Sequence, residues 1–133
     1  MLRAVFLGLL LLVPLSTNAQ QSLDGPAFSI LTEGKTFVFS LGGEPYGAEQ
    51  YLPGNRVYWS FLDGRCLAGS WREQAGKICF AYEDRPGEFQ CWEFWQNDTG
   101  LTASLSGPGS DGNVYSAQPS DEILYCMGPD AGV

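Results

Sequence analysis

The 133-residue chain contains no histidine, and its seven lysine and arginine residues face fifteen aspartate and glutamate residues, for a net charge of −8. The lack of histidine removes the commonest general base and the commonest metal ligand of proteins. The shortage of cations in an acidic chain disfavours binding to phosphate backbones and anionic membranes. We therefore expect no nucleic-acid partner and no catalytic site built on histidine.

The chain also lacks an apolar run long enough to span a bilayer, which takes about 20 residues. The run from Ala4 to Val13 follows a basic residue and ends at Pro14, and small residues precede a cleavage point after Ala19. This arrangement is typical of a secretory signal. The sequence predicts a signal peptide over residues 1–19 and one exported domain over residues 20–133. We expect that domain to be periplasmic or secreted, monomeric and not inserted in a membrane.

Short links between candidate strands indicate an all-β fold. Turn sequences recur at intervals of roughly 8–12 residues, which favours antiparallel strands over parallel strands with long crossovers. We expect a meander that forms a small barrel of about eight strands, with a helical turn from Pro26 to Gly34 near one end. The candidate strands are 35–41, 46–52, 56–62, 65–71, 77–83, 89–96, 101–106, 112–117 and 122–126.

Hairpin registers predict which side chains share a face. Asp63-Gly64 is typical of a two-residue turn, and it would place Trp59 opposite Ala68. A loop near residues 73–76 would place Trp71 opposite Ile78. Because strand side chains alternate between faces, one face carries a core that includes Trp71, Phe80 and Trp92. The other face carries Trp59, Cys66, Cys79, Cys91, Glu93 and Trp95.

Four cysteines in a small exported domain predict two disulfides. A tetrathiolate zinc site usually needs two closely spaced cysteine pairs, which the chain lacks, so we expect no metal and no cofactor. The hairpin around residues 85–87 pairs Cys79 with Cys91 across adjacent strands. Cys66 would lie too far along the strand to reach Cys79, which leaves Cys126 as its partner.

The second face is the candidate binding surface. Trp59 and Trp95 point away from the predicted core, and Glu93 adds a polar group beside them, so we expect these three residues to contact a ligand or partner. The alternative is that Asp121–Cys126 covers both indoles and makes a second small core.

No catalytic constellation is visible in the sequence. The carboxylates mostly flank turns, where they are solvated, and no nucleophile motif accompanies the serines. We expect a non-enzymatic binding module for a small apolar ligand. The alternative is an inhibitor or interaction protein for a basic extracellular enzyme, towards which the acidic surface would steer it. A carboxylate-dependent hydrolase ranks last.

Several short motifs resemble those of small uncharacterised exported bacterial β-domain proteins. They are Asp63-Gly64-Arg65-Cys66, Gly69-Ser70-Trp71, Ile78-Cys79-Phe80 and Cys91-Trp92. The resemblance covers a little over a third of the chain and implies an exported, disulfide-bonded β-domain without a transferable activity. The chain is more loosely similar to lipocalin-like barrels and to periplasmic lysozyme-inhibitor domains.

Overall fold

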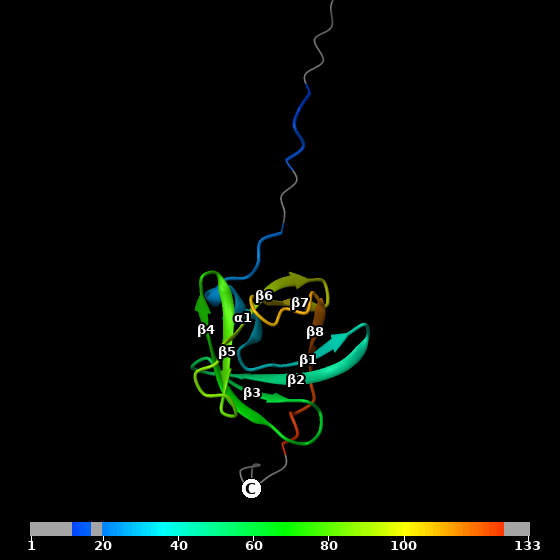
Figure 1. The fold of residues 1–133 in the computed structure, drawn as a ribbon. Helices are drawn as coiled ribbons and strands as arrows, with labels where there is room; N and C mark the ends of the chain where they lie inside the picture. The colour runs from blue at the N-terminus through cyan, green and yellow to red at the C-terminus, as the bar shows by residue number, and fades with distance from the viewer. Residues whose placement is uncertain (1–11, 17–19, 127–133) are drawn as a thin grey trace, which may run out of the picture.

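The computed structural model describes residues 12–16 and 20–126, and the part from residue 20 onward forms a closed β-barrel (Figure 1). Most of the predicted signal peptide, residues 1–11 and 17–19, lies outside the described residues. One helix precedes eight strands. They are α1 (Gly25–Thr32), β1 (Thr36–Leu41), β2 (Glu44–Leu52), β3 (Arg56–Ser60), β4 (Leu67–Gln74), β5 (Lys77–Tyr82), β6 (Gln90–Asn97), β7 (Gly100–Ser106) and β8 (Tyr115–Ser120).

The predicted antiparallel meander is confirmed. Each strand pairs with its neighbours in sequence, and β8 pairs with β1 to close the barrel. Short turns impose this order, because a tight turn can join only antiparallel strands. The predicted strand at 122–126 is wrong: this segment forms no strand but runs across the outer face of β1 to β3, where it packs near Ser60.

Helix α1 closes one end of the barrel. The Asp24 side chain caps the helix by accepting from the Ala27 backbone nitrogen at 2.9 Å, and Gly34, with a φ of 80°, turns the chain into β1. Phe28 is fully buried, with its ring centroid 4.6 Å from that of Phe94. Because α1 lies against the turns that follow β2, β4 and β6, the opposite end carries the loops that follow β1, β3, β5 and β7.

The expected core is confirmed in part. Trp71 and Phe80 are buried, whereas Trp92 is half-buried at the edge of the core. The β4–β5 register differs from the prediction, since Trp71 lies opposite Phe80 rather than Ile78. A two-residue turn at residues 75–76 sets this register, and the shift of two residues keeps the same side chains on the inner face.

The β3–β4 register is the prediction that matters most and it is wrong. Trp59 lies opposite Leu67, not Ala68, because strand β3 already ends at Ser60 and the link to β4 spans residues 61–66. The Ser60 hydroxyl accepts from the Leu62 backbone nitrogen at 3.0 Å, and Leu62 takes a φ of 64°, so no two-residue hairpin forms at Asp63-Gly64. A shift of one residue reverses the faces of β3 and turns Trp59 inward.

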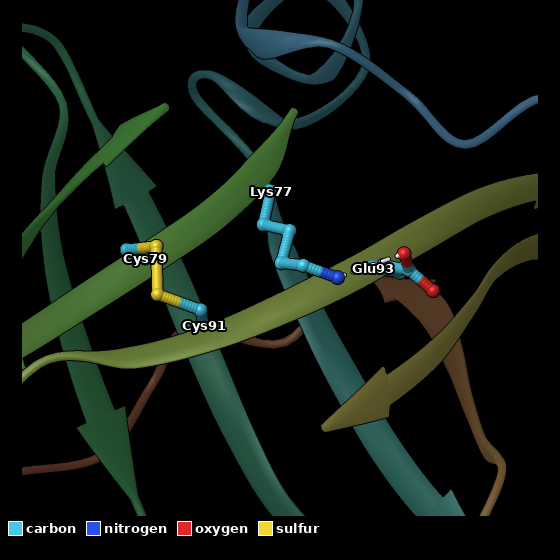
Figure 2. Close-up of polar contacts among 4 residues, drawn as sticks. All are labelled: Lys77, Cys79, Cys91 and Glu93. Carbon is cyan, nitrogen blue, oxygen red and sulfur yellow. Dashed lines mark hydrogen bonds and ion pairs between the residues drawn. A yellow bond between two sulfur atoms is a disulfide. The ribbon is translucent and has the colours of Figure 1, made fainter. Parts of the chain in front are cut away.

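Both predicted disulfides are present. Cys79 and Cys91 face each other on β5 and β6, with Cα atoms 3.9 Å apart (Figure 2). Cys66 in the β3–β4 loop joins Cys126, with Cα atoms 5.3 Å apart, and so ties the C-terminal segment to the barrel. Within the described ranges, no helix is long and apolar enough to cross a membrane.

Candidate ligand-binding cavity

A cavity of about 160 Å³ lies inside the barrel, towards the end opposite α1. The loops after β3 and β5 supply its mouth through Phe61, Asp84, Arg85 and Glu88. Ten of its sixteen lining residues are aromatic. They are Phe39, Tyr46, Tyr51, Trp59, Phe61, Phe80, Tyr82, Trp92, Phe94 and Tyr115.

Two glycines make room for two of these rings. A Cβ at Gly47 would lie 2.3 Å from the Trp59 indole, and a Cβ at Gly69 would lie 2.7 Å from the Tyr82 ring. Each ring therefore lies against a glycine of a neighbouring strand.

Glu49 is a buried acid in the cavity wall. It lies on β2 between Phe37 of β1 and Trp59 of β3, and its residue is only 2% exposed. The Tyr82 hydroxyl, from β5 across the barrel, donates to Glu49 Oε2 at 2.6 Å. Burial raises the pKa of Glu49 from its ordinary 4.5 to about 8, although the Tyr82 hydrogen bond opposes the rise.

A β-bulge places Glu49 inside. The β1–β2 ladder shifts by one residue between Phe39 and Ser40. Without that shift, the pairing of Leu41 with Glu44 would continue regularly and set Ala48 opposite Phe37. The bulge instead sets Glu49 there and points its carboxyl into the barrel.

Tyr51 presents the second polar group. The residue is 1% exposed, and its hydroxyl is buried without a hydrogen-bond partner among the residues that the structure describes. It lies close enough to the Glu49 carboxyl for each group to influence the pKa of the other, although its distance and angle fall short of a regular hydrogen bond. Burial first, and then the neighbouring Glu49 carboxylate, raise the pKa of Tyr51 well above its ordinary value. A buried hydroxyl without a partner is costly, so this site favours occupancy by a polar group.

The mouth is mainly acidic. Asp84 and Glu88 line it beside one cation, Arg85. Tyr115, at the start of β8, donates to Asp111 Oδ2 at 2.9 Å in the β7–β8 loop. Hydrogen bonds from the Asn113 backbone and from Tyr115 hold the pKa of Asp111 below its usual range, so this carboxylate is charged at neutral pH.

The structure separates the three residues expected to bind together. Trp59 lines the cavity, whereas Trp95 and Glu93 face outward on β6. Glu93 forms an ion pair with Lys77, with 3.0 Å between Lys77 Nζ and Glu93 Oε1, beside the Cys79–Cys91 disulfide (Figure 2). The C-terminal segment, which in the alternative interpretation covers both indoles, lies over the outside of β1 to β3 instead.

Sequence reasoning missed Glu49, Tyr51 and Tyr82 as site residues. Gly47 in β2 and Gly69 in β4 were the available signal, because a glycine inside a strand marks a close approach by another group. Among the described residues, no three histidine, cysteine or acidic side chains are grouped so that they could hold a metal ion.

No protein-family model, curated protein or solved structure matches the chain. The resemblance to small exported β-domain proteins therefore stays a prediction, and the site has to be interpreted from its own geometry.

Proposed function

We propose that the chain is an exported, non-enzymatic module that binds one small, mainly apolar molecule inside the barrel. The observation that carries the proposal is the aromatic cavity with an unpartnered Tyr51 hydroxyl at its wall. Apolar pockets with a few convergent polar groups are the usual form of a small-molecule site. Two disulfides in a small domain support export.

The size of the cavity limits the ligand. An apolar cavity of about 150 Å³ holds benzene in another protein. A volume of about 160 Å³ with an open mouth therefore suits one ring with a short substituent. A protein inhibitor would not require an aromatic cavity inside the barrel, so the geometry favours the binding module over that alternative.

The four tryptophans supply a built-in control for a binding experiment. Trp59 and Trp92 line the cavity, Trp71 lies in the core below it, and Trp95 faces outward. Titration with ethylbenzene, followed through the indole N–H signals in ¹H–¹⁵N NMR spectra, should shift Trp59 and Trp92 and leave Trp95 unmoved. Each signal is assigned from a Trp→Phe variant.

Two results would overturn the proposal. One is a spectrum that changes neither with ethylbenzene, up to its solubility limit, nor with the polar analogues of the same shape, benzyl alcohol and benzylamine. The other is a shift confined to Trp95, which would place binding on the outer face predicted from the sequence rather than in the cavity.

A further inference from the structure

Glu49 is a buried carboxyl, and among the residues that the structure describes it has no counter-ion. The ion pair found among the described residues, between Lys77 and Glu93, lies on the outer face of the barrel. A buried acid without a cation destabilises the fold. The carboxylate must either lose its hydration while it is charged or keep a proton at a pH where it would otherwise release it. Neither the packing nor the strand pairing of the barrel requires an acid here, because the neighbours in register are Phe37 and Trp59.

Several of the groups that line the cavity with Glu49 favour a positive charge. Aromatic ring faces attract cations through their quadrupole. In the cavity wall the ring centroid of Trp59 lies 5.6 Å from that of Phe39 and 5.8 Å from that of Tyr46. The Tyr51 oxygen offers an acceptor beside the carboxyl. An ammonium group has three N–H donors, which suits two or more oxygens at one place.

The approach to the cavity favours the same charge. Asp84 and Glu88 outnumber Arg85 at the mouth, and the chain as a whole has a net charge of −8. Such a field attracts cations and repels anions on the way in. An anionic ligand would also meet the Glu49 carboxyl and the electron-rich ring faces, so we exclude this class.

We propose that the ligand of the barrel is a small organic amine, held with its ammonium group at Glu49 and Tyr51 and its apolar part against the aromatic wall. This inference rests on the proposed binding function. It adds the chemical class of the ligand, which the cavity alone does not specify.

Binding of an amine should release a proton. In the empty barrel the raised pKa of Glu49 keeps this carboxyl mainly protonated at neutral pH. An ammonium ion beside it stabilises the carboxylate, so the carboxyl proton passes to solvent while the amine keeps its own. The titratable side chains that share the cavity with Glu49 are Tyr46 and Tyr51 on β2, Tyr82 on β5, Tyr115 on β8, and Asp84, Arg85 and Glu88 in the β5–β6 loop.

Three probes of nearly equal shape test the charge directly. Benzylamine, benzyl alcohol and ethylbenzene differ in one terminal group, NH₃⁺, OH or CH₃. Calorimetric and NMR titrations at pH 7 should show benzylamine bound at least about tenfold more tightly than either neutral probe. Glu49→Gln should abolish this preference. Glu44→Gln, which removes an exposed acid at the same end of the barrel, should preserve it.

A measurement on the unaltered protein keeps the test independent of how the variants fold. Calorimetry of benzylamine binding in two buffers with different ionisation enthalpies should show release of up to about one proton at pH 7.

The outcomes separate this inference from the function on which it rests. Equal or tighter binding of ethylbenzene would overturn the amine proposal and leave the binding module standing. A preference for benzyl alcohol would show that hydrogen bonding rather than charge decides. An amine preference that survives Glu49→Gln would overturn the role of Glu49, and the lack of any binding would overturn both proposals.

Discussion

Replacing Glu49 with glutamine should change how the stability of the barrel depends on pH. The folded protein binds the Glu49 proton up to a pKa of about 8, whereas the unfolded chain loses it near the ordinary value of 4.5. Between these values the folded state holds a proton that the unfolded state has released. The free energy of unfolding therefore falls as pH rises through this window, and it levels off above it.

The size of the effect follows from the two pKa values. Each pKa unit is worth about 1.36 kcal/mol, so burial of the ionised Glu49 costs roughly 5 kcal/mol above pH 8. The chain has no histidine, and its four cysteines are paired in disulfides, so no other side-chain type with an ordinary pKa between 5 and 8 obscures the effect. Glu49→Gln cannot ionise, and it keeps an oxygen for the Tyr82 hydroxyl.

Urea unfolding at pH 5, 7 and 9, with the disulfides intact, measures this difference. The parent protein should lose several kcal/mol from pH 5 to pH 9, and Glu49→Gln should lose little and be the more stable protein at pH 9. Glu44→Gln, an exposed control, should follow the parent. Parallel profiles for the parent and Glu49→Gln would refute the reasoning.

Three further changes have defined outcomes. Tyr82→Phe removes a hydrogen bond that lowers the Glu49 pKa, so a ¹³C NMR titration should place that pKa above the parent value of about 8; an unchanged or lower value would contradict this. Gly69→Ala introduces a Cβ 2.6 Å from a backbone carbonyl oxygen and 2.7 Å from the Tyr82 ring. It should lower the free energy of unfolding in urea by about 1–3 kcal/mol. An unchanged unfolding midpoint would show that the ring moves freely. Replacing Cys66 and Cys126 by serine removes a disulfide that joins residues 60 positions apart. It should lower the free energy of unfolding by about 4 kcal/mol, because the disulfide restrains the unfolded chain. A loss below 1 kcal/mol would show that this restraint is absent.

The fold could be predicted because local signals agree with the tertiary pairing. The short turns impose a meander, and the β5–β6 hairpin places Cys79 opposite Cys91 as expected. With that pair formed, Cys66 and Cys126 had no other partner. Cysteine pairing thus tolerated an error in the neighbouring register, since Cys66 lies in a loop rather than in the strand assigned to it.

The site could be predicted only in part, because two irregularities change which side chains point inward. The β1–β2 bulge turns Glu49 into the barrel, although alternation from the Gly42-Gly43 turn would turn it out. The long β3–β4 loop turns Trp59 inward, although Asp63-Gly64 predicts a tight hairpin. Each irregularity shifts the register by one residue, and a one-residue shift exchanges the two faces of a strand.

The acidic character of Glu49 also concealed it. An acid in a strand is ordinarily exposed, and the residues around it, from Glu44 to Gln50, do not alternate between polar and apolar types. Its hydrogen-bond partner Tyr82 is 33 residues away along the chain and lies against Gly69. Gly69 signals a close approach by some group, but the sequence does not signal which acid that group contacts.

A pH titration of the Glu49 carboxyl by ¹³C NMR, with and without benzylamine, tests whether this buried acid holds the ammonium group of the ligand. We expect a midpoint near pH 8 in the ligand-free protein, because the carboxyl is buried in the cavity, and a clearly lower midpoint when the amine is bound. A midpoint near the ordinary 4.5 in the empty protein, or one near 8 that saturating benzylamine does not lower, would contradict it.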